Sequence, residues 1–491
     1  MYSEQTGPGT GQKTVRYTVR GMKQIDYGHG SIFRAMILSA GPMMAAQVLS
    51  LLYNIVDRMY IARIPQTGTL ALGSIGLCFP ILTILTAFAS LYGSGGGPLS
   101  AIACGRGDLK EARTIQNTSF ALIVLTGLAL MAIGELFCLP ILQAFGATPG
   151  NIGYATGYLR IVLLGTVFSM LASGMNPFLN AQGFPAAGMM TVLIGAVLNI
   201  ILDPVFIFVF GWGIEGAAWA TVLSQIVSAL FIFWFLLRKK AVLKLEPLGC
   251  FRSIRLNRIK RITSLGFAGF IMQITNSLVQ SVSNTILGQT GGDLYISVMT
   301  IVSSVRQILD TPIFGLTDGT SPIISFNYGA GKPDRVRSTI RLMTLISIAY
   351  TCIIWLLILL QPQFFILLFN DDASLTRLAI PALKAYFFAF LFQAFQYSGQ
   401  TVFKSLGKRK QAIFFSLFRK VILVVPLTFL LPHYFGVMGV FQAEPISNFV
   451  GGSACFLTML ATVGKDLKKA VVKQDSTVKP NKQTDFPTGK K

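Results

Sequence analysis

The feature that most restricts the fold of this chain is a series of about twelve apolar runs, each near the ~20 residues that a helix needs to cross a bilayer. Hydrophobic residues make up 53% of the 491 and charged residues only 12%, which leaves too little polar surface for a soluble globular protein. We therefore predict an all-α polytopic membrane protein with about 12 transmembrane helices. The runs fall at residues 32–62, 70–99, 116–140, 153–178, 187–210, 215–237, 262–288, 294–324, 338–361, 377–403, 411–432 and 436–461.

The two halves of the chain repeat the same glycine and proline positions. Six spans per half is an even number, so both halves keep the same sense across the membrane. We expect two six-helix bundles related by a pseudo-twofold axis along the membrane normal, with a cavity between them. The positions Gly95, Pro98, Gly105, Gly107 and Gly183 recur, shifted by 224 (for example 407 − 183), as Gly319, Pro322, Gly329, Gly331 and Gly407.

Basic residues define the expected topology. They collect in segments that alternate with loops free of Lys and Arg, such as 147–152 and 211–216. By the positive-inside rule, both termini are cytoplasmic and the protein is a multi-pass protein of the cell membrane. The net charge of +22 (41 − 19) therefore reports orientation and contact with anionic lipid, and we expect no nucleic-acid partner. The expected segments are a cytoplasmic leader (1–30), an N-terminal bundle (31–237), a basic connector (238–261), a C-terminal bundle (262–462) and a disordered basic tail (463–491).

The sharpest candidate site lies in the fifth span. An aspartate at membrane depth costs about 2.5–3.5 kcal/mol unless it finds a partner or water. Asn199 and Asp203 are four residues apart, so they share one face of a helix. Pro204 has no amide hydrogen and should kink the helix, which frees the carbonyl of Ile200. The structural alternative is a kinked helix whose aspartate pairs with a neighbour only for packing.

Polar stripes mark the first span of each half. Gln47, Ser50, Asn54 and Asp57 follow the 3–4 spacing of one helical face in the first span, which Pro42 should bend. Gln273, Asn276, Gln280 and Asn284 do the same in the seventh span. We expect both stripes to line the cavity between the halves and to contact substrate. The alternative is interhelical hydrogen bonding, worth about 0.6 kcal/mol for each bond.

Two buried carboxylates in one half suggest ion coupling. If Asp57 and Asp203 face each other, burial and repulsion favour a proton on one of them, and a cation competes for the same oxygens. That competition is the linkage an antiporter needs.

No acid pair recurs in the second half, where Leu427 replaces Asp203. Arg306 and Asp310 are spaced to form a self-neutralising structural pair. Glu444 has no obvious partner and is a further candidate for the substrate cavity. Arg419 and Lys420 either extend to the interface or pair with such an acid.

Four segments together resemble the MATE (multidrug and toxic compound extrusion) transporters, closest to the bacterial DinF-like and MepA-like branch. The segments are 41–64, 93–113 ("GSGGGPLSAIACGRGDLKEAR"), 179–208 ("LNAQGFPAAGMMTVLIGAVLNIILDPVFIF") and 213–225. The resemblance implies two six-helix bundles in a V and alternating access. It also implies efflux of small amphipathic, mostly cationic drugs in exchange for inward H+ or Na+, with no cofactor.

The resemblance also implies an ion site in the N-terminal bundle. By motif match that site is formed by Asp57, Asn176, Asn199, Asp203 and Thr221, which are also the candidate Na+ ligands, with Tyr158 nearby. NorM-type members use a Glu on the seventh helix and an Asp on the tenth, where this chain has only glutamines: Gln273, Gln280, Gln393 and Gln396. We therefore place ion coupling in the N-terminal bundle. We also expect the protein to be a monomer.

Two other functions are considered. A flippase of a lipid-linked substrate on the related fold should have a basic cavity, whereas the buried stripes here are neutral or acidic. A membrane-embedded enzyme needs clustered histidines, paired acids at the depth of the lipid headgroups or a metal motif. The two histidines and six unpaired cysteines provide none of these, so we predict no catalytic residues and no metal beyond the candidate Na+.

Overall fold

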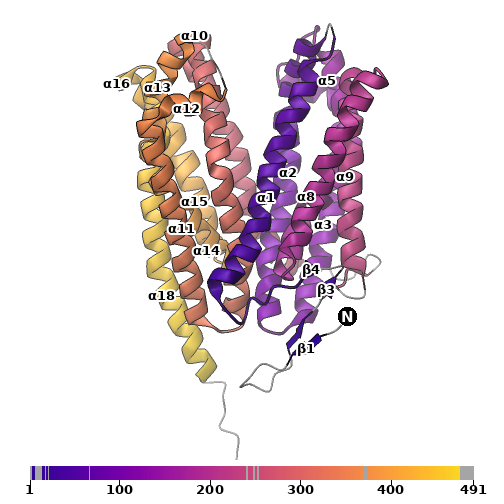
Figure 1. Ribbon diagram of the computed structural model, residues 1–491, viewed down its shortest axis with the longest axis vertical. Coiled ribbons are helices and arrows are strands. Elements are labelled where there is room, and N and C mark those ends of the chain that lie inside the picture. Colours follow the sequence, from indigo (N-terminus) through magenta and orange to yellow (C-terminus); the bar gives the residue numbers. More distant parts are fainter. Residues whose placement is uncertain are drawn as a thin grey trace, which may run out of the picture.

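The helices form two bundles that lie side by side, one from each half of the chain (Figure 1). The computed structural model describes residues 3–5, 14–16, 18–19, 22–65, 67–238, 241–246, 249–250, 254–369 and 373–475. Within these residues, nine helices are long and apolar enough to cross a membrane, and two bent helix pairs raise the number to eleven. The predicted all-α polytopic fold is confirmed.

In the first half the fourth span is a bent pair, in which the helical segments 152–164 and 166–181 meet at 57°. The fifth span changes from α-helix to π-helix at Pro204. The elements of the first half are α1 (Ile32–Ala62), α2 (Gly68–Gly105), α3 (Leu109–Leu136), α4 (Cys138–Ala144), α5 (Ile152–Leu164), α6 (Thr166–Gly174), α7 (Asn176–Ala181), α8 (Pro185–Pro204), the π-helix η1 (Val205–Val209) and α9 (Gly213–Leu237).

In the second half α10 contains two spans that meet at Gly292, where φ is 72°. The part after Gly292 is the predicted span 294–324. It carries Arg306, Asp310 and Asp318 and falls outside the eleven apolar spans. The elements are α10 (Leu256–Gly329), α11 (Pro333–Leu360), α12 (Pro362–Leu367), α13 (Ala373–Phe387), α14 (Leu391–Ser405), α15 (Arg409–Leu417), the π-helix η3 (Phe418–Val424), α16 (Val425–Phe435), α17 (Met438–Ser447), the π-helix η4 (Asn448–Gly452) and α18 (Ser453–Asp475).

The internal repeat is visible in the backbone. Gly107 and Gly183 have φ values of 78° and 84°, and their counterparts Gly331 and Gly407 have 67° and 69°. Residues with a Cβ rarely adopt this left-handed conformation, so each half makes the same turns with the residue type that those turns require. The shared glycines therefore fix the shared backbone plan.

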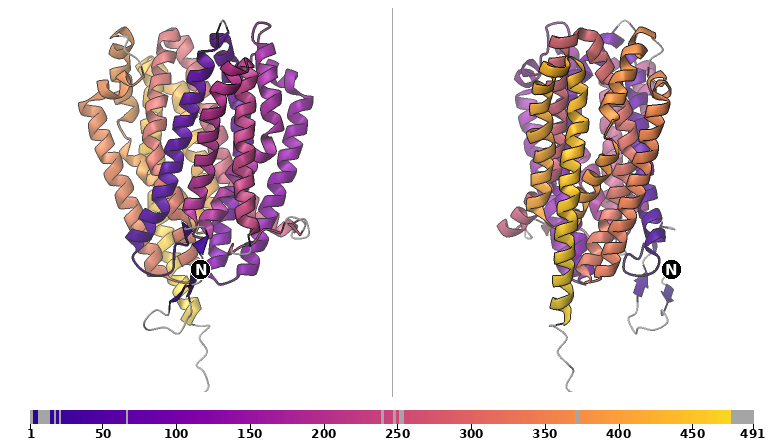
Figure 2. Two further views of the ribbon diagram at one scale, coloured as in Figure 1. Left: turned by 45° about the vertical axis from the view of Figure 1, so that its right-hand side comes forward. Right: turned by 90° about the vertical axis from the view of Figure 1, so that its left-hand side faces the viewer.

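The halves meet at the end of the molecule that carries the N-terminus and lie apart at the other end (Figure 1). The last helix, α18, extends beyond the bundle at the same end as the N-terminus (Figure 2). Glycines make the contact between the halves close. A Cβ on Gly266 of α10 would overlap Leu91 O of α2, and one on Gly319 would overlap the backbone of Ala40 on α1. Small residues of this kind let membrane helices approach at backbone distance.

Both ends of the chain contain more secondary structure than the sequence indicates. Two short antiparallel hairpins precede α1, one from β1 (Ser3–Gln5) and β2 (Thr14–Arg16), the other from β3 (Thr18–Val19) and β4 (Met22–Lys23). At the other end α18 continues to Asp475, so the prediction of a disordered tail from residue 463 is wrong for residues 463–475. Residues 476–491 of that tail lie outside the described residues.

Candidate functional site

The acidic stretch of α8 folds as its spacing predicts. Asn199 and Asp203 lie one turn apart, and both side chains are buried, with 3% and 0% exposure. Asn199 Nδ2 donates to Asp203 Oδ1 at 3.1 Å and to Thr221 Oγ1 of α9 at 3.4 Å. Regular α-helix ends at Pro204, and Val205–Val209 continue as π-helix, a distortion that often marks functional sites.

Asp57 of α1 reaches the same place. Its carboxyl group lies beside that of Asp203, so the two groups interact directly. Tyr53 and the buried Tyr158 of α5 lie within electrostatic range of both carboxyl groups. Five of the predicted site residues therefore meet here: Asp57, Tyr158, Asn199, Asp203 and Thr221. Asp57 and Asp203 are called the acid pair below.

Three oxygen atoms of this group have no hydrogen-bond donor. Asp57 Oδ1, Asn199 Oδ1 and Asp203 Oδ2 are buried and have no partner among the described residues. Leaving a buried polar atom unpaired costs about 1–3 kcal/mol, and more when it is charged. A proton on one carboxyl group, or a small cation between the oxygens, would remove this cost because these are hard ligands. The arrangement is therefore suited to reversible ion binding.

Asn176 lies elsewhere. Its Nδ2 donates to Gly188 O at 3.1 Å, and Gly188 precedes Asn199 on α8 by eleven residues, which is about 16 Å along a helix. Asn176 is therefore some three turns from the acid pair. The grouping that the resemblance implied is not found in this structure, because Asn176 begins α7, beyond the break after α6.

The polar stripes lie on α1 and the first part of α10, helices that border the space between the halves (Figure 1). Asn54, Asn276 and Gln280 are exposed, while Gln47 and Gln273 are half-buried. Two of the five form bonds within their own half: Asn54 with Ser50 O and Gln280 with Ser303 Oγ. Gln273 accepts from Thr86 of the other half at 3.4 Å. Most of these amides are thus not committed to interhelical bonds.

Pro42 does not interrupt α1, which is one helix from Ile32 to Ala62.

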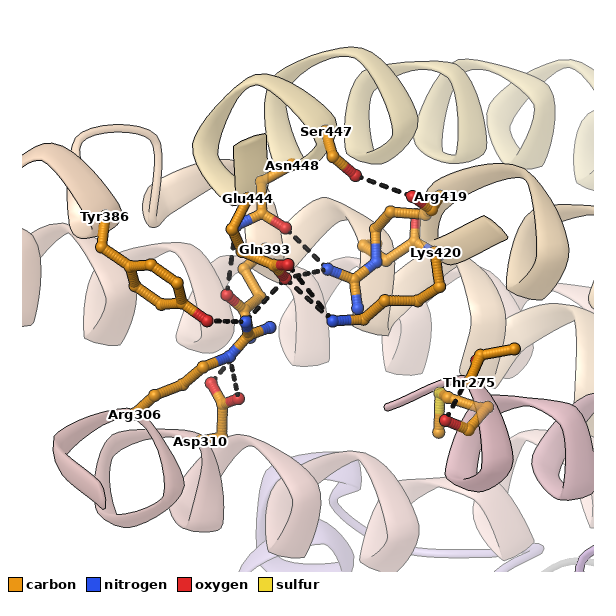
Figure 3. Close-up of polar contacts among 12 residues, drawn as sticks. Thr275, Arg306, Asp310, Tyr386, Gln393, Arg419, Lys420, Glu444, Ser447 and Asn448 are labelled. Carbon is orange, nitrogen blue, oxygen red and sulfur yellow. Dashed lines mark hydrogen bonds and ion pairs between the residues drawn. The ribbon is translucent and has the colours of Figure 1, made fainter. Parts of the chain in front are cut away.

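Glu444 has the partners that the sequence did not reveal (Figure 3). Its carboxylate contacts Arg306 Nη1 at 2.6 Å, Arg419 Nη1 at 2.8 Å and Lys420 Nζ at 3.0 Å. Glu444 is only 3% exposed. The expectation that it lacks a partner is wrong, and its role as a free acid in a substrate cavity is not supported. Arg419 and Lys420 pair with an acid instead of extending to the interface.

The Arg306–Asp310 pair forms as predicted, with a separation of 3.2 Å. Asp310 also accepts from Gln393 Nε2 at 2.7 Å and Tyr397 OH at 3.1 Å. The complete group, called the charge cluster below, contains three cations and two acids: Arg306, Asp310, Arg419, Lys420 and Glu444. Sequence reasoning missed Tyr386, Tyr397 and Asn448 around it. The sequence signal that could have revealed this cluster was the presence of basic residues inside apolar runs, because such residues require a buried acid.

Comparison with known proteins identifies relatives along most of the chain. The family model MatE matches residues 42–205 and 269–430. "Multidrug export protein MepA" of Staphylococcus saprophyticus is 25% identical over 429 residues, which cover 87% of this chain and 93% of that protein. A crystal structure of MATE in complex with MaD3S superposes with a TM-score of 0.84 at 23% identity, covering 91% of this chain and 99% of that one. An outward-facing multidrug resistance MATE family transporter of the MOP superfamily superposes with a TM-score of 0.83, also at 23% identity, covering 91% and 99%.

The structure has two similar helical bundles that are joined at one end, and the first bundle carries a buried acid pair. These features place this chain among the polytopic membrane transporters. The chain belongs to the MatE family. This confirms the family that the sequence motifs indicated, and the relatives and structures named above are transporters and not enzymes.

Proposed function

We propose that this chain is a secondary multidrug efflux antiporter that exports amphipathic, mostly cationic compounds in exchange for inward H+ or Na+. The observation that carries the proposal is the acid pair beside Asn199, because these three side chains together present three buried, unpaired oxygens. The export function of the MepA relatives, which match 93% of their length, supports the same conclusion.

Coupling follows from competition for these oxygens. In the ion-free state the two carboxylates repel each other, and a proton or Na+ relieves the repulsion. For Na+ we propose Asp57, Asn199, Asp203 and Thr221 as ligands, with Tyr158 nearby. Asn176 does not contribute in this geometry. Because ion binding changes the charge between α1 and α8, it can favour a different packing of these helices and so bias alternating access.

We propose that cargo binds between the halves, against the polar stripes. Asn54, Asn276 and Gln280 offer exposed amides there, and the acid pair supplies negative charge that favours cationic cargo. We propose that both termini are cytoplasmic, which the distribution of the basic segments supports; the halves would then lie apart on the outer side. We propose a monomer in the cell membrane, without cofactor.

The test is ethidium efflux by the variants Asp57→Asn and Asp203→Asn. Each should abolish efflux while expression stays near that of the wild type. Asp334→Asn is the matched control, because Asp334 is a solvent-exposed acid at the start of α11. Full efflux by both variants would remove the acid pair from the mechanism.

The coupling ion is identified in everted vesicles. A pH gradient and a sodium gradient are imposed separately, and ethidium transport is followed in each case. A proton-coupled carrier responds to the first and a sodium-coupled carrier to the second, and loss of that response in Asp203→Asn assigns it to the acid pair.

Flipping of a lipid-linked substrate is the alternative, and the charge cluster is the observation that bears on it. The cluster has one more cation than acid, as a phosphate-binding site requires. However, Arg306, Arg419 and Lys420 are all held by Glu444; Arg419 and Lys420 are buried, and the Arg306 side chain is only 13% exposed. Efflux of a cationic dye by vesicles that fail to move a fluorescent phospholipid would decide for the antiporter.

A further inference from the structure

The segment that leads into α1 crosses from one half to the other. Residues 24–30, called the strap below, bind the end of α7 and the loop after it in the first half. Ile25 N donates to Gly183 O at 2.9 Å, Gln24 Nε2 donates to Gln182 O at 2.9 Å, and Tyr27 OH donates to Asn180 O at 2.9 Å. Burial raises the pKa of the Tyr27 phenol, so that hydroxyl remains a hydrogen-bond donor.

The same strap is bound by the second half. Arg335 of α11 donates to the carbonyls of Gly30, Tyr27 and His29 at 2.8, 3.2 and 3.3 Å. Lys332 Nζ donates to Gly28 O at 2.8 Å, and Asn327 Nδ2 donates to Tyr27 O at 2.8 Å. Because the partners of the strap belong to both halves, these bonds cannot all survive if the halves separate at this end.

A second connection occupies the symmetry-related position. Glu111 is the third residue of α3, as Arg335 is the third residue of α11, and the two are 224 residues apart (335 − 111), the offset of the repeat. Glu111 of the first half pairs with Arg258 at 3.1 Å and Arg261 at 3.2 Å, both at the start of α10 in the second half. Arg335 thus holds the chain just before α1, the first helix of the first half, and Glu111 holds the first turns of α10, the first helix of the second half.

We propose that Arg335 with the strap and Glu111 with Arg258 and Arg261 form two symmetry-related latches that hold the halves together at the cytoplasmic end. They set the balance between the two states of alternating access. The proposal rests on the proposed function for the direction of transport. Both latches must open before cargo can enter from the cytoplasm, so they determine how readily the transporter returns to the inward-open state.

The latches are not needed merely to keep the halves in contact at this end. The halves already meet through the glycine contacts of α2 with α10. Those apolar contacts can slide or part at little cost in lipid, where apolar surface gains nothing from burial between helices. Charge-assisted hydrogen bonds are directional and are lost over a short separation. The latches therefore give this end two discrete positions, closed and open.

The test is a distance measurement across the halves in the purified full-length chain. Spin labels are placed at Lys110→Cys and Lys410→Cys, both exposed and one in each half. The two half-buried cysteines, Cys104 and Cys352, are first replaced by Ala, since the other four are buried. Without ion gradient or substrate, the parent should give mainly the short distance of the closed end.

The combined variant Arg335→Gln with Glu111→Gln should lower the ratio of closed to open populations by about tenfold or more, the effect of losing one charge-assisted hydrogen bond. Each single variant should have a smaller effect. The matched controls, Arg337→Gln and Glu246→Gln, remove exposed ion pairs that do not join the halves, and they should leave the distances unchanged. If Arg335→Gln fails to fold, Lys332→Gln removes one bond of the same latch.

An unchanged distance distribution in the combined variant overturns the proposal, as does an equal change in the controls. The measurement does not depend on transport. The Asp57→Asn efflux assay tests the antiport function, and these distances test the latches, so a failure of one proposal is distinguished from a failure of the other.

Discussion

The two halves share a backbone plan and treat buried charge in opposite ways. In the first half Asp57 and Asp203 face each other, and neither forms an ion pair within the described residues. In the second half the two acids of the charge cluster are matched by three cations (Figure 3). The first arrangement requires something from outside, a proton or a cation, whereas the second carries its own counter-charges.

This difference separates an exchangeable site from a permanent one. A charge at membrane depth must be neutralised. Permanent partners fix the geometry of the helices that carry them, here α10, η3 and α17, and leave nothing for an ion to do. An unpartnered acid pair can change its charge in each transport cycle. We therefore propose that the first half carries ion coupling and that the second half is a rigid scaffold.

The largest effect that tests this comparison is expected for Glu444→Gln. Removing the carboxylate leaves Arg306, Arg419 and Lys420 buried with Asp310 as the remaining acid. Breaking a buried ion pair in this way costs about 3–5 kcal/mol. The melting temperature of the purified variant should fall well below that of the wild type, as measured by thermal unfolding in detergent.

The matched control is Glu246→Gln, because the Glu246–Arg113 pair is half-exposed and such pairs contribute about 0–1 kcal/mol. Combining Glu444→Gln with Lys420→Met should recover part of the loss, since it removes one of the uncompensated cations. An unaltered melting temperature in Glu444→Gln would show that the charge cluster is not a scaffold.

The opposite result is expected in the first half. Asp203→Asn removes a charge from a repelling pair and keeps an acceptor for the Asn199 amide. The free energy of unfolding should therefore fall by no more than about 1 kcal/mol or rise, and the melting temperature should stay near that of the wild type or increase. Efflux should nevertheless be lost. Measuring both quantities on the same preparation separates a site that binds an ion from one that supports the fold. A large drop in stability would instead make Asp203 a structural acid.

The parts of this picture that the sequence predicted depend on local spacing or on the repeat. Asn199 and Asp203 are one turn apart, and the bond between them follows from that spacing alone. The turns at Gly107 and Gly331 follow from the 224-residue offset. The partners of Glu444 could not be predicted in the same way, because they come from helices distant in the chain whose relative rotation is set by packing.

Two further residues show where sequence reasoning failed. Asn176 has the residue type that the resemblance requires, but its depth in the bundle depends on the break between α6 and α7. Tyr27 lies in a leader that appears merely polar, yet it is only 3% exposed and contacts both halves. Hydrophobic periodicity predicts neither the break between α6 and α7 nor the contacts of Tyr27 with both halves, since both features depend on tertiary contacts.

The smallest effect is expected for Thr221→Val. The Thr221 hydroxyl accepts from Asn199 Nδ2 at 3.4 Å, a long bond whose loss costs no more than about 1 kcal/mol. Without it the Asn199 amide is held only by Asp203, so its unpaired oxygen is less firmly oriented toward an ion. The ion concentration for half-maximal efflux should rise by about two- to fivefold, with little change in the maximal rate. Ser228→Ala on the same helix is the control, since its hydroxyl bonds Thr191 O away from the acid pair. An unchanged ion dependence in Thr221→Val would remove the hydroxyl from the ligand set and leave the acid pair and Asn199 as the ion site.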